Sequence, residues 1–98
     1  MVAPVEIIGL SWYRREDWLT LRELFVDAHL LHTKWEDWQR AAVTVEYELR
    51  QRGKRVVRAE IRPEPFAAWC TNLGIAPDAS ARNRWASEAA YRETRQQN

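Results

Sequence analysis

Residues 33–53 limit the possible folds most, because their pattern predicts one long amphipathic helix. Its apolar side chains recur at intervals of three and four residues: Trp35, Trp38, Ala42, Val45 and Leu49. At 100° per residue they form a seam within about 80° of arc. Thr33 and Glu36 match a capping box at the start of this helix, and Gly53 is expected to end it. The rest of the chain must therefore cover the seam.

A shorter helix is expected before it, beginning in the segment "WYRREDW" at residues 12–18. With Arg14 as the cap, Tyr13 and Trp18 have the spacing of a hydrophobic staple. The apolar positions that follow are Leu21, Phe25 and Ala28. A link of about five residues to the long helix then predicts that the two helices pack as an antiparallel hairpin.

The two tryptophans of this segment raise the question of a binding site. On one helix Trp12 and Trp18 would point about 240° apart, so they cannot form a single aromatic clamp. The segment is therefore interpreted as the start of a helix whose aromatic side chains contact different parts of the core.

Two short strands are expected. Val5–Leu10 is an apolar run with β-branched residues, and Pro4 restricts pairing at its leading end. Arg55–Ile61 alternates in the manner of a half-buried strand. Because an isolated pair of strands is only marginally stable, two arrangements stay open. Either the strands pair with each other and lean on the helical hairpin, or the second strand pairs with its copy in another subunit.

Two further helices are expected after the second strand. Pro63 and Pro65 open the third helix and Gly74 closes it. Its inward side chains are Phe66, Trp69, Cys70 and Leu73. Asp78 caps the fourth helix, whose inward side chains are Ala81, Trp85 and Ala89. Residues from about 93 to 98 have nothing to bury and are expected to fray.

The predicted fold class is therefore α+β and mostly helical, in the order β-α-α-β-α-α, as a single small domain over residues 1–98. A domain of this size has a thin core, which six tryptophans reinforce. The content of 46% apolar and 30% charged residues is typical of a folded chain rather than a disordered one.

Composition also argues against binding driven by net charge, a membrane span, export and an internal disulfide. The net charge of +1 gives no overall field that would select nucleic acid or an acidic lipid surface. No stretch approaches the roughly 20 apolar residues of a membrane span, and the first residues lack the pattern of an export signal. Cys70 is the only cysteine, so no internal disulfide can form. A cytoplasmic protein without a membrane partner is expected.

A second apolar stripe predicts self-association. Val43 and Tyr47 project from the long helix on the side opposite the Trp38 seam, and Leu19 and Val26 repeat this on the first helix. We expect a homodimer whose contact surface is built from these four side chains or from the edge of the Arg55–Ile61 strand. The alternative is that the fourth helix covers one stripe within the same subunit. An unidentified protein partner is compatible with the same surface.

A basic turn supports a different function. Five cations gather around it: Arg50, Arg52, Lys54, Arg55 and Arg58. They could hold phosphates, so a nucleic-acid-binding accessory protein is the alternative function. Against it, the turn follows a helix C-terminus, where cations are favourable for another reason. No aromatic side chain interleaves with the cations, as a platform for single-stranded nucleic acid requires.

Catalytic and metal-binding patterns are weak. Asp27, His29 and His32 are the only candidate metal ligands, and the histidines sit near a predicted helix end, where imidazoles commonly bond the last carbonyls. Cys70 shares the inward face of its helix with Trp69, which indicates a buried structural thiol. The chain has no glycine-rich phosphate loop and no nucleophile-elbow sequence. Enzyme activity is therefore disfavoured, and no cofactor is expected.

Several segments resemble a group of small bacterial proteins of about this length: "WYRREDW", "TKWEDW", "GKRVVRAEIRPEPFAAWC", "LG" and the later "AR". That family shares a WYR…VVR…FxxWC pattern. The matching residues here are Trp12, Tyr13, Arg14, Thr33, Trp38, Gly53, Val56, Val57, Arg58, Phe66, Trp69, Cys70 and Arg82. Where the family often has Leu-Pro, this chain has Leu31–His32, so the resemblance assigns the histidines no role. No activity is known for the family, so the resemblance implies a complete small protein but no cofactor or catalytic residue.

Overall fold

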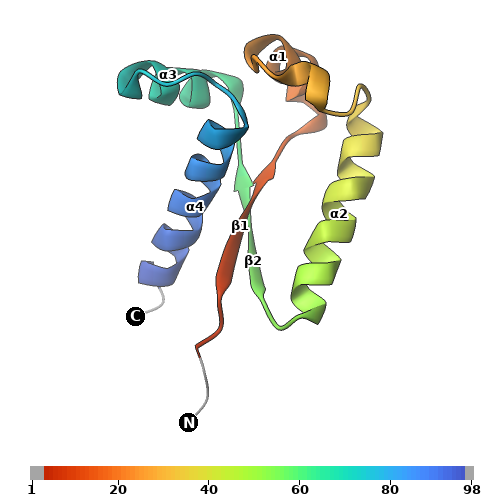
Figure 1. Ribbon diagram of the computed structural model, residues 1–98, viewed down its shortest axis with the longest axis vertical. Helices are drawn as coiled ribbons and strands as arrows, with labels where there is room; N and C mark the ends of the chain where they lie inside the picture. The colour runs from red at the N-terminus through yellow and green to blue at the C-terminus, as the bar shows by residue number, and fades with distance from the viewer. Residues whose placement is uncertain (1–3, 97–98) are drawn as a thin grey trace.

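The described residues, 4–96 of the chain, form two strands and four helices in a computed structural model (Figure 1). Their bounds are β1 Ile7–Trp12, α1 Trp18–Leu24, α2 Trp35–Gln51, β2 Arg55–Glu60, α3 Pro63–Leu73 and α4 Ala79–Gln96. Short 3₁₀ turns at Arg15–Asp17 and Ala28–Leu30 lie on either side of α1. The fold is mixed α+β and mostly helical, and the predicted order β-α-α-β-α-α is confirmed.

The two strands pair with each other in parallel, with Ile7 opposite Arg55. At the two ends of the ladder the Arg55 N–H donates to the Glu6 carbonyl at 3.0 Å and the Ile61 N–H donates to the Trp12 carbonyl at 2.9 Å. Of the two arrangements that the sequence left open, pairing within one chain is the one observed. Parallel neighbours need a long crossover connection, and the segment containing α1 and α2 supplies it.

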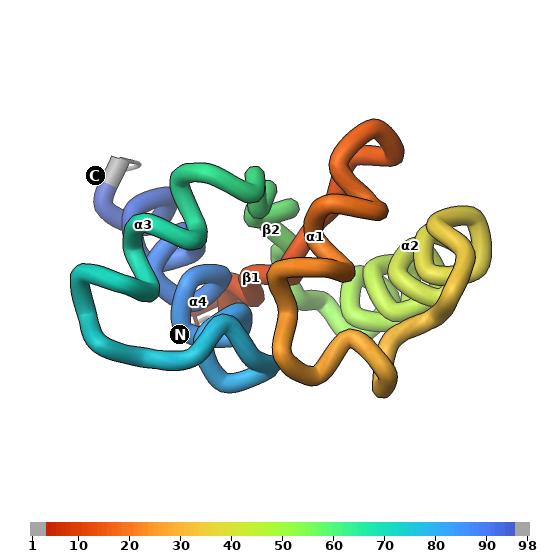
Figure 2. The backbone as a smooth tube through the Cα atoms, turned by 90° about the horizontal axis from the view of Figure 1, so that it is seen from above, coloured from red at the N-terminus to blue at the C-terminus, as the bar shows by residue number. Residues whose placement is uncertain are grey.

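Helices cover both faces of this narrow sheet, with α4 on one side and α2 on the other (Figures 1 and 2). α4 lies so close to β1 that a Cβ at Gly9 would be 2.0 Å from the carbonyl oxygen of Ala86. On the opposite face the ring centroids of Trp12 and Trp38 are 5.2 Å apart. Side chains alternate along a strand, so β1 turns one set toward α4 and the other toward α2. The two sets are Ile7, Gly9 and Ser11, and Ile8, Leu10 and Trp12.

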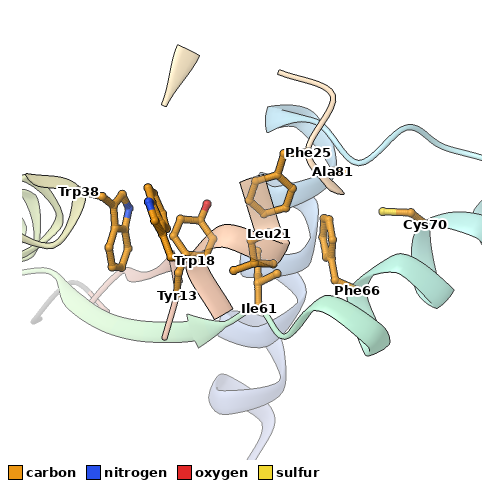
Figure 3. Packing of buried hydrophobic residues seen from close by; sticks show 9 residues of the cluster. All are labelled: Tyr13, Trp18, Leu21, Phe25, Trp38, Ile61, Phe66, Cys70 and Ala81. Carbon is orange, nitrogen blue, oxygen red and sulfur yellow. The ribbon is translucent and has the colours of Figure 1, made fainter. Parts of the chain in front are cut away.

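Aromatic rings form much of the buried core, which Figure 3 shows as a row of side chains from Trp38 to Cys70. Trp12 and Trp18 both contact Trp38, with centroids 5.2 and 5.8 Å away. The expectation that these two indoles contact different parts of the core is therefore wrong. Trp12 belongs to β1, so the helical angle between the two positions does not apply. The predicted staple is confirmed, because the rings of Tyr13 and Trp18 lie 5.8 Å apart.

α1 is shorter than its apolar spacing predicts. It ends at Leu24, and Phe25 already has an extended backbone with ψ of 122°. Beyond this point Asp27 turns to bind α4, so a tertiary contact replaces the last helical turn. α1 packs against α3 and meets α2 through the Trp18–Trp38 contact (Figure 1). The predicted antiparallel packing of α1 along α2 is therefore replaced by a crossing arrangement.

The predicted capping box of α2 is wrong. Lys34 occupies the N-cap and makes no side-chain cap bond. The Thr33 carbonyl accepts a hydrogen bond from the Trp18 indole at 2.9 Å, and Glu36 accepts one from Arg15 at 2.9 Å. Thr33 is therefore engaged by the first residue of α1 and Glu36 by the turn before it, instead of by each other.

The other helix ends agree with the sequence. Gly53 and Gly74 have positive φ of 80° and 66°, as expected for residues that stop helices. The Ala81 N–H donates to the Asp78 carboxylate at 3.0 Å, which confirms the predicted cap of α4. Fraying from residue 93 is not observed up to Gln96, where α4 ends. Residues 97 and 98 lie outside the described part of the chain.

Candidate protein interface

The outer edge of β1 carries backbone groups that no described strand pairs with. In a parallel ladder alternate residues turn their N–H and C=O groups toward the partner strand. The bonds at Glu6 and Trp12 show that the even-numbered residues of β1 face β2. The backbone groups of Ile7, Gly9 and Ser11 therefore face outward. Such a row of unpaired groups is a template for a further strand.

The usual protection of an exposed strand edge is missing from β1. Native edges commonly carry lysine, proline or a bulge that discourages pairing with another chain. The strand "IIGLSW" contains no charged residue and no proline. Glu6, just before it, is bound by Lys54 at 3.5 Å. The edge is therefore neutral as well as open.

α4 presents an uncharged flank to the same edge. Its residues facing that side fall within about 80° of arc at 100° per residue: Asn83, Ser87, Tyr91 and Thr94. Four of the six charged residues of the helix occupy the next arc and are exposed: Arg84, Glu88, Arg92 and Arg95. The other two, Arg82 and Glu93, lie on the opposite side and pair with Asp27 and Arg55. The flank beside β1 is therefore polar or aromatic but carries no charge.

Two clefts lie along this edge. One of about 390 Å³ is formed between the first half of β1 and α4. The other, of about 260 Å³, lies between the second half of β1, α4 and α2. Eighteen residues line the two clefts, and Arg82 is the only charged one, in a chain that is 30% charged. Tyr91 and Val45 border them and are 62% and 44% exposed.

The single charge in the second cleft is neutralised from within the fold. The Arg82 guanidinium donates from Nη1 and Nη2 to the two carboxylate oxygens of Asp27 at 2.8 and 3.1 Å. Its side chain is 7% exposed and lies 4.5 Å from the centroid of the Phe25 ring. The hydrogen bond from Arg82 lowers the pKa of Asp27, and burial raises the pKa of the neighbouring Tyr13 phenol. At neutral pH this pair is ionised and internally compensated.

These features together define a surface that we call the uncharged band. It consists of the outer edge of β1 and the side chains that flank it on α2 and α4. Its members are Ile7, Gly9, Ser11, Ala42, Val45, Asn83, Ser87, Ala90, Tyr91 and Thr94. Chemically, the band can form backbone hydrogen bonds along one line and apolar contacts on both sides of it.

The outer edge of β2, which the sequence offered as one of two possible interfaces, is guarded by charges. Arg58 donates to the two carboxylate oxygens of Glu46 at 2.7 and 2.8 Å, and its guanidinium lies 4.0 Å from the centroid of the Trp12 ring. Glu60 is bound by Arg14, and its carbonyl accepts a hydrogen bond from the Trp85 indole at 3.1 Å. This edge therefore has the protection that β1 lacks.

We expect Glu46→Gln to weaken the fold in a pH-dependent way. The Glu46 side chain is 4% exposed, and the hydrogen bonds from Arg58 lower its pKa. Losing charge-assisted bonds to a half-exposed arginine costs about 1–2 kcal/mol at neutral pH. Since the folded-state pKa is depressed, this stabilisation is present at neutral pH and is lost as pH falls below about 4.

Urea unfolding at pH 7 and pH 3 measures this effect, with Glu48→Gln as the control at an exposed position on the same helix. The stability difference between wild type and Glu46→Gln should shrink at pH 3. An equal difference at both pH values would contradict the ionised Glu46–Arg58 pair.

The four predicted interface side chains are all exposed, but they do not form one stripe per helix. Leu19 is on α1, whereas Val26 lies in the connection after it, because α1 ends early. Val43 and Tyr47 are on α2 and are 42% and 63% exposed. None of the four lines either cleft of the uncharged band. Their role in an interface stays a prediction.

Most of the predicted phosphate contacts already bind carboxylates. Arg50 and Arg58 both contact Glu46, at 3.4 and 2.7 Å. Lys54 pairs with Glu6 at 3.5 Å and Arg55 with Glu93 at 3.0 Å. Arg52 is exposed. A phosphate would have to compete with these carboxylates for four of the five cations.

The structure separates the candidate metal ligands. Asp27 binds Arg82 and accepts a hydrogen bond from the Ala79 N–H at 3.0 Å, while His29 and His32 are exposed. Among the described residues no group of three or more His, Cys, Asp or Glu side chains is placed to hold a metal ion. Cys70 is buried, and that burial raises the pKa of its thiol.

No helix in the described part of the chain has the length and apolar character needed to cross a membrane. No protein-family model matches this chain, and the comparisons with curated proteins and with solved structures found no match either. The resemblance to the group of small bacterial proteins therefore stays a prediction, and the functional argument depends on the geometry of the uncharged band.

Proposed function

We propose that this protein is a non-enzymatic protein-interaction module that acts as a homodimer through the uncharged band. The observation that carries the proposal is the open and neutral outer edge of β1, between helix flanks that are also neutral. Adding a strand to such an edge is a common mode of protein recognition, in which backbone hydrogen bonds provide affinity and neighbouring side chains provide specificity. The proposed setting is the cytoplasm, as the sequence indicates.

The nucleic-acid alternative has weaker support. Binding to phosphates needs cations that are free to release counterions, and four of the five cations in the basic turn are paired within the chain. A salt titration of binding to generic DNA separates the two functions, since phosphate contacts weaken steeply with salt. Binding that falls at least tenfold between 50 and 200 mM salt, as about two phosphate contacts would produce, would favour the alternative.

Light scattering over a range of concentrations tests the homodimer. We expect a dimer for the wild type. Ser87→Lys should associate at least about tenfold more weakly, because its lysine puts a charge into a neutral interface. Ser80→Lys adds the same charge to the same helix outside the band and is expected to leave association unchanged. A wild-type protein that remains monomeric at all concentrations would exclude the homodimer.

A further inference from the structure

We propose that two copies of the chain join by antiparallel pairing of β1 with β1, centred on Gly9, to form one continuous four-stranded sheet. This inference rests on the proposed homodimer and specifies how its interface is built. Each copy has a sheet of only two strands, and pairing through β1 would enlarge it to four, a usual size for a sheet. The strand order across the dimer is β2, β1, β1 and β2, so the guarded β2 edges become the ends of the sheet.

A second copy is the occupant because the edge is complementary to itself. The outward-facing residues Ile7, Gly9 and Ser11 are spaced evenly about Gly9. A twofold axis at Gly9 places Ile7 opposite Ser11 of the second copy and Gly9 opposite Gly9. Every outward backbone group of β1 then has a partner in β1 of the second copy. The neighbouring antiparallel registers, centred on Ile8 or Leu10, leave Ser11 or Ile7 without a partner inside β1, and those centred on Ile7 or Ser11 leave two residues without one.

Charge and size agree with this arrangement. A twofold axis brings each charge of the interface close to its own copy, so a self-pairing surface must be nearly free of charge. The band satisfies this condition, since the one charged residue that lines its clefts, Arg82, is bound by Asp27. Two α4 helices would lie beside each other across the axis. Ser87, a small and exposed side chain on the facing flank, allows that approach.

The proposed register predicts which residues a disulfide can join. With Gly9 on the axis, Ile8 faces Leu10 of the second copy in a pair without direct hydrogen bonds. The Cα atoms of such pairs are about 4.5 Å apart, which lies within the range that a disulfide spans. In the register centred on Ile8, residue 8 faces itself, and in the register centred on Leu10, residue 10 faces itself.

The experiment uses full-length chains carrying either Ile8→Cys or Leu10→Cys, with a size tag on one of them. The variants are refolded separately and together and then oxidised gently. We expect a disulfide-linked heterodimer in the mixture and no linked dimer from either variant alone. The wild type, whose Cys70 is buried, controls for that thiol, and circular dichroism checks that each variant folds.

The outcomes distinguish the pairing from the homodimer itself. A linked dimer from Ile8→Cys alone or from Leu10→Cys alone would overturn the register. Absence of any linked heterodimer, while light scattering shows that the variants are dimers, would overturn β1 pairing and leave the proposed function standing. If the folded variants and the wild type are all monomers, both the homodimer and the β1 pairing are excluded.

Discussion

Gly9→Ala is expected to lower the stability of the protein by about 3 kcal/mol or more. A methyl group at this position would lie 2.0 Å from the Ala86 carbonyl oxygen, 2.6 Å from its carbonyl carbon and 3.3 Å from its Cα. Forcing additional volume into a packed site costs about 1–3 kcal/mol, and helix backbone yields less readily than a side chain. α4 would have to move away from β1. For a domain of this length the melting temperature should fall by roughly 12 °C or more.

Thermal unfolding followed by circular dichroism measures this loss, and Gly53→Ala is the matched control. Gly53 has a positive φ of 80° but nothing within 4 Å of an added Cβ. An alanine there is strained without a clash and should cost about 1–2 kcal/mol. If Gly9→Ala loses no more stability than Gly53→Ala, the close packing of α4 on the sheet is contradicted.

Asp27→Asn is expected to cost about 3–5 kcal/mol, because it leaves a buried guanidinium without its counterion. Arg82 is 7% exposed and directs two hydrogen bonds to this carboxylate. Asparagine keeps an oxygen that can accept from the Ala79 N–H, so the loss reports mainly on the charge. The lowered pKa of Asp27 also means that its stabilisation is present at neutral pH and is lost as pH falls below about 4.

A double variant isolates this interaction. Adding Arg82→Met to Asp27→Asn removes the buried charge and should restore part of the lost stability. Asp37→Asn is the surface control, since its pair with Arg40 is 3.4 Å long and exposed, and it should change stability by less than about 0.5 kcal/mol. Urea unfolding at neutral pH compares all of these proteins. A double variant no more stable than Asp27→Asn would show that the two residues are not coupled.

Local patterns in the sequence predict the order of elements and most helix ends. Gly53, Gly74 and Asp78 act within one or two turns of their own helices, so their effect is readable without knowing the fold. The end of α1 and the start of α2 were predicted wrongly for the opposite reason. Asp27 bonds to α4, Thr33 bonds to Trp18 at the start of α1, and Glu36 bonds to Arg15 in the turn before it. Long-range partners override the local preference in each case.

The interface could be predicted only in part. The sequence indicated self-association, and the one strand edge that it offered as a contact surface was that of β2. Choosing between the edges requires knowing that the strands are parallel and which residues of β1 face outward. The buried Glu46, which guards the β2 edge, lies about 20° beyond the apolar seam of α2. The sequence does not reveal that Arg58 binds it there. One signal was available: the absence of charge from residues 7–12, in a chain rich in charge elsewhere.

The parallel pairing of β1 and β2 also determines when the molecule can assemble. Ile7 and Arg55 are 48 positions apart, so the ladder cannot begin as a local hairpin. As the chain leaves the ribosome, β1 must wait for the whole crossover to be made before its partner arrives. Throughout that interval both of its edges are open, and chains translated close together on one message could join through them before either has finished folding.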